Sequence, residues 1–344
     1  MDALALLKEV SKRDGINGRI LEVLEAAAQL VGNDVDALDE ALIRACTDAP
    51  SGAFEPCRHI IEAGGKRIRP MLCMLVYRAS GGIDPLPMDL AISCELLHSA
   101  TLLHDDVIDE GEVRRGRPAT RVVHGNAISI LGGDYLLVKT VEIVSRRGPA
   151  FMDFFLKTLR RIISGELVQL KQRGSIGTSE DDYFHIIEGK TASLFQWTAF
   201  SGALAAGKQE DLCSQVGRFG WHMGVAFQIV DDVLDFTADA TELGKNLLAD
   251  ISEGKMTLPV ILAGRVSENM QSVLRNLANA KDPAIVASEV ADIVKSTGAI
   301  ELAREKATEH TNLAIQALES ARGLSSDVVG LLKDLAGALL ERKT

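Results

Sequence analysis

Hydrophobic positions along the chain recur mainly with the three- and four-residue spacing of α-helices. Residues 20–30 form one such amphipathic stretch, and residues 35–46 form the next. Glycine, proline and small polar residues interrupt the pattern at helix-sized intervals, at 64–65, 80–87, 111–118, 147–149, 173–179, 207, 237–246, 298 and 323. A length of 344 residues allows about two domains, but no interruption is a long linker and no short repeat occurs. The pattern therefore predicts one all-α domain, a single large helical bundle over residues 1–344.

The composition agrees with helix packing, because 47% of residues are hydrophobic but only 4% are aromatic. The net charge of −11 argues against nucleic acid as a partner and fits ligands that arrive with metal cations. The five cysteines include no CxxC pair, so neither a disulfide framework nor a zinc site is expected. The chain has no signal-like start and no uncharged apolar run of about 18 residues, which predicts a cytoplasmic protein without a transmembrane segment.

Acidic residues gather at the end of one apolar helical run, in LLHDDVIDEGEVRRGRP (102–118). Asp105, Asp106 and Asp109 precede Gly111, the expected helix C-cap. They therefore lie where the helix dipole favours cations, and Asp105 and Asp109 share one helix face. Local stability does not favour two like charges at this place, so the cluster predicts a bound cation.

A second segment, FQIVDDVLDF (227–236), repeats the arrangement with Asp231, Asp232 and Asp235. A helical bundle can bring the two clusters face to face. Mg²⁺ prefers oxygen ligands and is usually held by one or two carboxylates together with substrate phosphates. One such cluster could be a solvated helix end, but the pair predicts a site for several Mg²⁺ ions, with Mn²⁺ as an alternative.

Other metal or phosphate sites with related sequence motifs fit this chain less well. Calcium is disfavoured because no EF-hand spacing occurs. A di-iron bundle needs two Glu-x-x-His motifs, and the chain has one, at Glu95 and His98. The GKT at 189–191 lacks the earlier glycine of a P-loop, since Phe184 stands there.

Basic residues follow the acidic clusters and a glycine pair, as expected for phosphate ligands. They occur in GGKRIRP (64–70), after the first acidic cluster, in the GKT at 189–191, and after the second acidic cluster. In chain order they are Lys66, Arg67, Arg69, Arg114, Arg115, Lys190, Lys245 and Lys255. Any single lysine could instead serve solubility. His98, His104 and Gln228 lie on the helices that lead to the acids. A histidine at such a place is more often a hydrogen-bonded core residue than a catalyst, and Gln228 could equally be a hydrogen-bonded buried amide.

These segments together resemble the trans-isoprenyl diphosphate synthases. The resemblance covers about residues 54–265 and rests on GGKRIRP, HSATLLHDDVIDEGEVRRGRPA, GNAISILGGDYLL, GEL, GKTASLF, FQIVDDVLDF and GKMTLPVI, in this order. Residues 1–45, an N-terminal scaffold, and residues 270–344 match only as amphipathic helices. The resemblance implies helices around a deep central cavity, a homodimer, and head-to-tail condensation of an allylic diphosphate with isopentenyl diphosphate.

The resemblance also implies roles for individual residues. The metal ligands would be Asp105, Asp106, Asp109, Asp231 and Asp235, with Asp106 and Asp232 as partial or supporting groups. Isopentenyl diphosphate would contact Lys66, Arg69, His98 and Arg115, and the allylic substrate would contact Arg114, Lys190, Thr191, Gln228, Lys245 and Lys255. Asp105, Asp109, Asp231, Lys190 and Gln228 would be catalytic. Residues 245–250 lack the proline and glycine often seen there, which leaves the role of Lys245 open.

Product length is expected to depend on Ala100 and Thr101, which precede the first acidic cluster. In this type of family, bulky aromatic residues there stop the product early, because a residue four positions back lies about 5.4 Å deeper on the same face. The small residues predict a long product, hexaprenyl to decaprenyl with octaprenyl expected, for quinone side chains. Phe154 or Phe155 would form the floor of the tunnel. Ordinary core packing of Ala100 and Thr101 remains an equal alternative.

Several other functions remain open. A short-chain farnesyl or geranylgeranyl diphosphate synthase would share the motifs, whereas a class I terpene cyclase would lack the second acidic cluster and GGKRIRP. A non-catalytic subunit of a heteromeric synthase typically loses one acidic cluster, and a metal-binding bundle would leave the basic residues unexplained. Release of a long product also suggests peripheral contact with a membrane.

Overall fold

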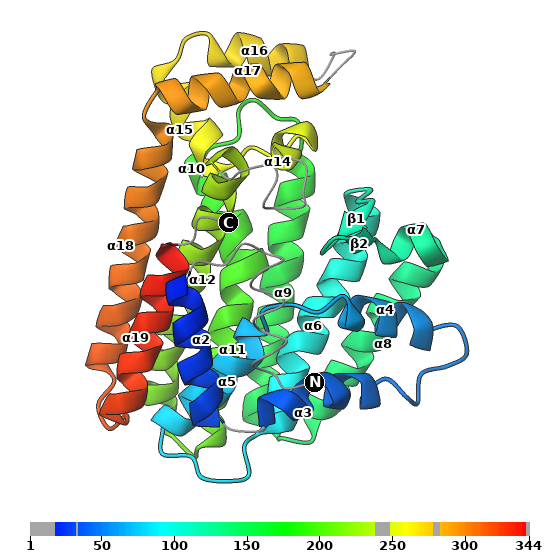
Figure 1. The fold of residues 1–344 in the computed structure, drawn as a ribbon, viewed down its shortest axis with the longest axis vertical. Helices are drawn as coiled ribbons and strands as arrows, with labels where there is room; N and C mark the ends of the chain where they lie inside the picture. The colour runs from blue at the N-terminus through cyan, green and yellow to red at the C-terminus, as the bar shows by residue number, and fades with distance from the viewer. Residues whose placement is uncertain (1–17, 32–33, 238–247, 278–282, 342–344) are drawn as a thin grey trace.

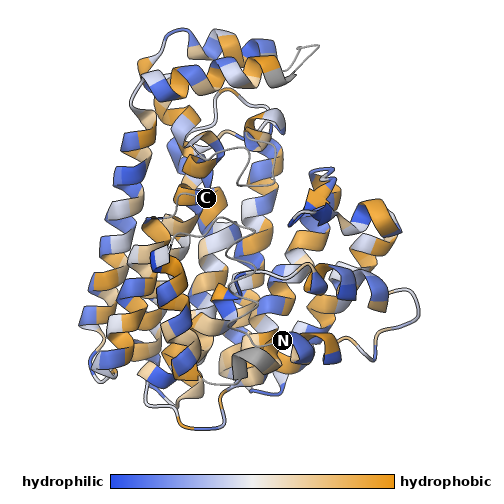
Figure 2. Cartoon of the chain, in the orientation of Figure 1, coloured by the Kyte–Doolittle hydropathy of each residue, from blue (hydrophilic) through white to orange (hydrophobic). Residues whose placement is uncertain are grey.

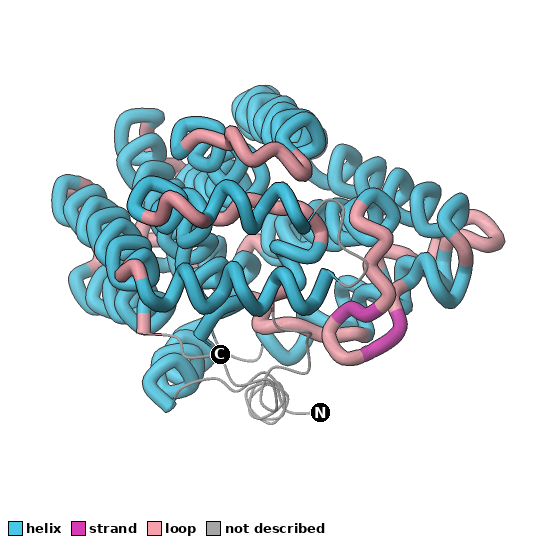
Figure 3. Tube along the Cα trace, turned by 90° about the horizontal axis from the view of Figure 1, so that it is seen from above, coloured by secondary structure: helices cyan, strands magenta, loops and turns pink. Residues whose placement is uncertain are grey.

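The computed structural model describes residues 18–31, 34–237, 248–277 and 283–341, and nearly all its elements are helices (Figures 1 and 3). The first half contains α2 (Gly18–Val31), α3 (Asp34–Arg44), α4 (Phe54–Glu62), α5 (Ile68–Ala79), α6 (Met88–Ile108), α7 (Thr120–His124), α8 (Asn126–Ser145) and α9 (Pro149–Gln172). The second half contains α10 (Glu180–Ile187), the π-helix η1 (Glu188–Ala192), α11 (Ser193–Ala205), α12 (Glu210–Thr237), α14 (Ala249–Ser252), α15 (Leu258–Val266), α16 (Met270–Leu277), α17 (Pro283–Ser296), α18 (Ala299–Ser320) and α19 (Ser326–Leu340). Two short strands, β1 (Val113–Arg114) and β2 (Arg117–Pro118), pair antiparallel. The all-α prediction is confirmed.

The helix boundaries follow the sequence signals. Gly148 has φ of 104° and directly precedes Pro149, the first residue of α9, so glycine supplies the turn and proline begins the helix. Ser179 and Asp182 form a capping box at the start of α10. The interruption expected at 237–246 falls almost entirely outside the described residues.

The helices form a bundle in which α12 packs against α11 and α18, while α6 packs against α8 (Figure 1). Helix α11 also contacts α5 and α9 and lies in the interior, where Trp197 and Phe195 are fully buried. The outer helices α18 and α19 alternate between hydrophilic and hydrophobic turns (Figure 2), as expected for helices with one buried face. Among the described helices, none combines the length and apolar composition needed to cross a bilayer.

Candidate functional site

A cavity of about 830 Å³ lies where several helices begin or end. It is bordered by the end of α6, the C-terminal part of α9, η1, α12 and the segments that precede α5 and follow α14. Sixteen of the candidate residues from the sequence line it: Lys66, Arg67, Arg69, His98, Thr101, His104, Asp105, Asp109, Arg114, Arg115, Lys190, Thr191, Gln228, Asp231, Asp232 and Lys255. The fold thus brings segments that are up to 189 residues apart, from Lys66 to Lys255, into one site.

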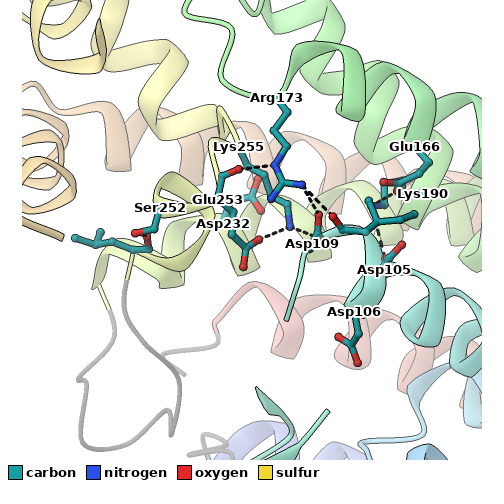
Figure 4. Close-up of polar contacts among 12 residues, drawn as sticks. Asp105, Asp106, Asp109, Glu166, Arg173, Lys190, Asp232, Ser252, Glu253 and Lys255 are labelled. Carbon is teal, nitrogen blue, oxygen red and sulfur yellow. Dashed lines mark hydrogen bonds and ion pairs between the residues drawn. The ribbon is translucent and has the colours of Figure 1, made fainter. Parts of the chain in front are cut away.

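The first acidic cluster presents its outer pair to this cavity. Asp109 is the C-cap of α6, and its backbone N–H donates to the carbonyl oxygen of Asp105 at 2.8 Å. Lys190 Nζ lies 3.6 Å from a carboxylate oxygen of Asp105, and Lys255 Nζ donates to Asp109 at 2.8 Å. Figure 4 shows Asp105 and Asp109 beside these lysines. The carboxylates of Asp105 and Asp109 each lie next to a lysine. The carboxylates could bind a metal ion, and the lysines could bind the diphosphate that accompanies it.

Asp106 differs from the expectation of a metal contact. It is fully buried, does not line the cavity and points away from Asp105 and Asp109 in Figure 4. Arg114 donates to Asp106 Oδ1 through Nε at 2.9 Å, and burial raises the pKa of the carboxyl group. Arg114 borders the cavity, but its guanidinium group is held by this buried carboxylate.

The second acidic cluster is organised by a chain of side-chain hydrogen bonds. Thr191 Oγ1 donates to Gln228 Oε1 at 2.8 Å, and Gln228 Nε2 donates to Asp232 Oδ1 at 2.9 Å. Tyr183 donates its hydroxyl to the other oxygen of Asp232 at 2.6 Å. Burial, with a further contribution from the charge of Asp250, raises the pKa of Asp232 well above its usual value. Because Asp232 accepts from the amide nitrogen, the chain fixes the orientation of Gln228 in the cavity wall.

Asp235 also differs from its expected role as a metal ligand, because it does not line the cavity. Its carboxylate is hydrogen-bonded by the backbone at Leu248, Ala249 and Asp250, around the start of α14. Burial and the charge of Asp250 raise its pKa to about 7. Asp250, four residues ahead of Gly254, borders the cavity in its place. Lys245 lies outside the described residues.

Ala100 likewise does not line the cavity. It is 2% exposed and belongs to a core cluster with Leu38, Leu42 and Leu103. Thr101 borders the cavity, and its hydroxyl donates to the carbonyl oxygen of His98 at 2.8 Å. Ala100 is therefore not placed to contact a growing product in the cavity, whereas Thr101 is.

The π-helix η1 presents Lys190 and Thr191, and such single π-turns often occur at functional sites. Glycines allow it to lie close to α9, since a Cβ on Gly189 would be 2.6 Å from the carbonyl oxygen of Arg161. Glu166 of α9 forms an ion pair with Lys190, and burial raises the pKa of Glu166. The close contact thus sets the lysine between Glu166 and Asp105.

A separate cluster of basic side chains lies on the wall formed by α5, α6 and the turn before β2. Arg69 Cζ lies 4.6 Å from the centre of the Phe195 ring, and burial lowers the pKa of Arg69. Burial also lowers the pKa of Arg115 to about 10. Arg69 Nε and Arg115 Nη1 are buried without an acceptor among the described residues. Because buried N–H groups nearly always have a partner, this wall is suited to an anion.

His98 lies in the same cluster. Burial lowers its pKa well below the usual value, and the charges of Arg69, Arg115 and other arginines act in the same direction. The imidazole is therefore neutral near pH 7 and can donate a hydrogen bond without adding charge. Arg67, 6% exposed, also borders the cavity, but it forms ion pairs with Glu95, another lining residue, and with Asp39.

Among the cavity residues that were not assigned a role from the sequence are the ionisable side chains Glu166, Arg173, Tyr183 and Asp250. Arg173 donates to the carbonyl oxygens of Glu253 at 2.9 Å and Ile108 at 3.1 Å, and lies 3.6 Å from Asp109 (Figure 4). It therefore joins the end of α9 to the end of α6 and to the loop after α14. The spacing of Glu166, Gln169 and Arg173 on one helical face was a signal that could have identified this wall.

The carboxylates suit a metal that is only partly bound by protein. Among the described residues, no group of three or more His, Cys, Asp or Glu side chains is arranged to hold an ion by itself. Asp105, Asp109 and Asp231 reach the cavity from two walls. This oxygen-only set fits Mg²⁺, which keeps several waters and takes its remaining ligands from substrate phosphates.

Comparison with known proteins gives consistent results. The family model described as polyprenyl synthetase matches residues 52–295. An all-trans-nonaprenyl-diphosphate synthase of Rhodobacter capsulatus is 38% identical over 84% of this chain and 89% of its own length. A short chain isoprenyl diphosphate synthase of Methanothermobacter thermautotrophicus is 34% identical, over 89% and 95%. The crystal structure of a decaprenyl diphosphate synthase from Rhodobacter capsulatus superposes with a TM-score of 0.85 at 33% identity, over 92% and 98%.

Proposed function

Because the chain belongs to the polyprenyl synthetase family, we propose that it is a trans-prenyltransferase that elongates an allylic diphosphate with isopentenyl diphosphate. The observation that carries this proposal is the cavity with two different anion-binding walls. One wall bears the outer acids and lysines, and the other bears the buried arginines with unpartnered N–H groups. A prenyl-elongating enzyme needs both, since each substrate carries a diphosphate.

The acidic wall would receive the allylic diphosphate. Asp105, Asp109 and Asp231 would hold Mg²⁺, which supplies Lewis-acid stabilisation of the leaving pyrophosphate. Lys190 and Lys255 would stabilise the negative charge that develops as the carbon–oxygen bond breaks, because fixed charges need no reorganisation at that moment. Thr191 and Gln228 would lie beside the allylic carbons, with Gln228 oriented by Asp232. Lys245 remains a proposed contact of the same substrate.

The basic wall would bind isopentenyl diphosphate through Lys66, Arg69, Arg115 and neutral His98. Gly65 belongs to this wall, since a Cβ there would lie 2.9 Å from the Arg115 guanidinium group. The departing pyrophosphate would accept the final proton, so no side-chain nucleophile is required. Asp106 would act through Arg114, and Asp235 through the placement of Asp250 and Lys255.

Apolar side chains complete the cavity and would keep water from the allylic cation. Ile162, Leu170, Ile187 and Phe227 are among them. We propose a long product, about octaprenyl, for quinone side chains. Relatives named nonaprenyl, heptaprenyl and octaprenyl diphosphate synthases support a long product, and a short chain isoprenyl diphosphate synthase matches with similar identity. The small Thr101 is the feature that favours a long one.

An exposed apolar face on α8 and α9 supports a homodimer. It comprises Ile130, Leu131, Val138, Val141, Leu156, Ile163, Leu167 and Leu170. Ile163 and Leu167 are 58% and 61% exposed and also border the cavity, so a second copy would close that wall. Leu167→Arg should weaken the dimer in sedimentation measurements, whereas a chain that sediments as a monomer before mutation would contradict the proposal.

The proposed enzyme would act in the cytoplasm, which suits its five buried cysteines, all free. Contact with a membrane would be peripheral and limited to product release. A subunit without activity is the second candidate function, but both acidic clusters and both walls of the cavity are retained here, which favours catalysis.

The test is incubation of the purified full chain with farnesyl diphosphate, labelled isopentenyl diphosphate and Mg²⁺, followed by chromatography of the products. A ladder that ends near octaprenyl would support the whole proposal. Products that end at farnesyl or geranylgeranyl diphosphate would preserve the reaction but contradict the length. Absence of incorporation, with or without Mg²⁺, would contradict the activity and favour the regulatory subunit.

A further inference from the structure

Arg173, the first residue after α9, joins the C-terminal ends of two other helices. Its Nε donates to the carbonyl oxygen of Glu253 at 2.9 Å, and its Nη1 donates to that of Ile108 at 3.1 Å (Figure 4). Ile108 is the last residue of α6, and Glu253 is the C-cap of α14. The last carbonyl groups of a helix have no partner within the helix, so one guanidinium group here serves two helix ends.

The backbone beside this contact fixes the turn that follows α14. Gly254 has φ of 78°, and its N–H donates to the carbonyl oxygen of Ile251 at 2.9 Å. Lys255 N–H donates to the carbonyl oxygen of Asp250 at 2.8 Å, which completes a Schellman motif. The carbonyl oxygen of Gly254 accepts from Gly174 N–H at 2.8 Å, and a Cβ on Gly254 would lie 3.1 Å from that nitrogen. Glycine is therefore needed both for the turn and for its contact with the end of α9.

The turn after α14 brings Lys255 to the first acidic cluster. Lys255 Nζ donates to Asp109 Oδ2 at 2.8 Å, and Arg173 Nη1 lies 3.6 Å from Asp109 Oδ1. Arg173 binds the residue directly before Asp109 and the residue two positions before Lys255, so it ties together the two segments that carry this ion pair. Its hydrogen bonds go to neutral carbonyl groups and do not cancel its charge, which borders the cavity.

We propose that Arg173 is a positioning residue for the allylic diphosphate site, because it holds Lys255 against Asp109 across the gap between α14 and α6. This inference rests on the proposed function. Without the bridge, the turn after α14 stays bonded to Gly174 but is no longer tied to α6. Lys255 then loses its fixed place beside Asp109, and substrate binding has to supply the free energy that orders it. Preorganisation of the acidic wall is thus the contribution of Arg173.

The first test measures the kinetics of Arg173→Gln and Arg173→Lys in the incorporation assay. The Arg173 side chain is 34% exposed, so both variants should fold. Arg173→Lys keeps the charge but replaces two bridging nitrogens of one planar group by a single nitrogen. Both variants should therefore raise the KM for farnesyl diphosphate by about tenfold, the cost of ordering one long side chain, and require more Mg²⁺. The KM for isopentenyl diphosphate should stay that of the wild type, whereas full rescue by Arg173→Lys would overturn the bridging role.

The matched control is Arg121→Gln. Arg121 also donates to carbonyl oxygens just beyond α6, those of Glu110 at 2.9 Å and Gly111 at 3.2 Å, but it comes from α7 and does not border the cavity. Its loss should leave the KM for farnesyl diphosphate unchanged. An equal rise in Arg121→Gln and Arg173→Gln would mean that any loosening of this end of α6 has the same effect, and would overturn the role of Arg173.

A double-mutant cycle tests whether Arg173 acts through Lys255. Once Lys255→Gln has removed the positioned ammonium group, loss of the bridge should have little further effect. The double variant Lys255→Gln, Arg173→Gln should therefore have the incorporation rate of Lys255→Gln alone. Fully additive losses would mean that Arg173 acts on the substrate independently of Lys255, and would overturn the positioning role.

A binding measurement separates this inference from the proposed function, because it needs no turnover. Inorganic pyrophosphate is titrated into the full chain in the presence of Mg²⁺ and followed by calorimetry. Arg173→Gln should bind it about tenfold more weakly than the wild type, and Arg121→Gln should bind it equally well. A wild type that incorporates no isopentenyl diphosphate but shows this difference would overturn the proposed function and support the role of Arg173. An active wild type whose pyrophosphate affinity is unchanged in Arg173→Gln would overturn the role of Arg173 alone.

Discussion

The two acidic clusters have the same pattern, Asp-Asp-x-x-Asp, but they use their last member differently. Asp109 borders the cavity and pairs with Lys255, whereas Asp235 is hydrogen-bonded by the backbone around the start of α14. The difference lies in where each helix ends. Helix α6 ends at Ile108, so Asp109 is its C-cap, while α12 continues two residues beyond Asp235 to Thr237. The last Asp of the same sequence motif therefore has a different role in the two clusters, because the two helices end at different positions relative to it.

The middle acids are more alike. Asp106 and Asp232 are both buried, and each holds a side chain of the cavity wall, Arg114 in one case and Gln228 in the other. Neither needs to touch a metal to matter. The comparison predicts that substitutions at the last acids, Asp109 and Asp235, have the most different effects, and that substitutions at the middle acids, Asp106 and Asp232, have the most similar ones.

The largest effect is expected at Asp105. Asp105→Ala should lower turnover by at least about a hundredfold, as loss of a preorganised charge-stabilising group does. Turnover is measured by incorporation of labelled isopentenyl diphosphate, with circular dichroism as the control for folding. Near-normal turnover in a folded variant would contradict the assignment of the first cluster to the metal.

The next effect concerns the middle acid of the first cluster. Arg114→Gln would leave the buried carboxylate of Asp106 without its cation, which should lower the free energy of unfolding by about 3 kcal/mol. Urea denaturation measures this change. The control is Arg121→Gln, because Arg121 donates to the backbone carbonyls of Glu110 and Gly111 at a more exposed position. Equal losses in the two variants would contradict the importance of the buried pair.

A smaller effect is expected at the middle acid of the second cluster. Tyr183→Phe removes one hydrogen bond to Asp232, worth about 1 kcal/mol, and should lower turnover several-fold by loosening Gln228. Tyr77→Phe is the matched control, since Tyr77 donates to the carbonyl of Ile83 at 2.8 Å, at the far end of α5. That control should lose stability but retain turnover. The same turnover in both variants would argue against the hydrogen-bonded chain.

The smallest effect is a change in pH dependence at Asp235. Its pKa is about 7 in the folded chain and 3.8 for an ordinary carboxyl group, so the folded state holds its proton more tightly. Stability from this group is present at low pH and lost as the pH rises through this interval. Asp235→Asn should therefore flatten the fall in unfolding free energy between about pH 5 and pH 7. An unchanged slope in Asp235→Asn would contradict the burial of its carboxyl group.

Much of the molecule could be predicted from local patterns. Helical periodicity and turn residues marked the helices, and the ordered motifs marked most of the cavity, because these signals lie within short segments. The orientation of neighbouring residues was harder to predict. Thr101 borders the cavity while Ala100, one step round the same helix, packs toward α3 and α4. Arg173, Tyr183 and Asp250 come from three further elements, and only tertiary packing brings them to the acids.

The most direct test of this account compares Asp109→Asn with Asp235→Asn in one assay, the rate of isopentenyl diphosphate incorporation over a range of Mg²⁺ concentrations. The account predicts that Asp109→Asn loses at least about tenfold more turnover than Asp235→Asn and needs more Mg²⁺. It also predicts that Asp235→Asn keeps the Mg²⁺ dependence of the wild type. Equal losses, or a greater loss and a higher Mg²⁺ requirement in Asp235→Asn, would contradict it.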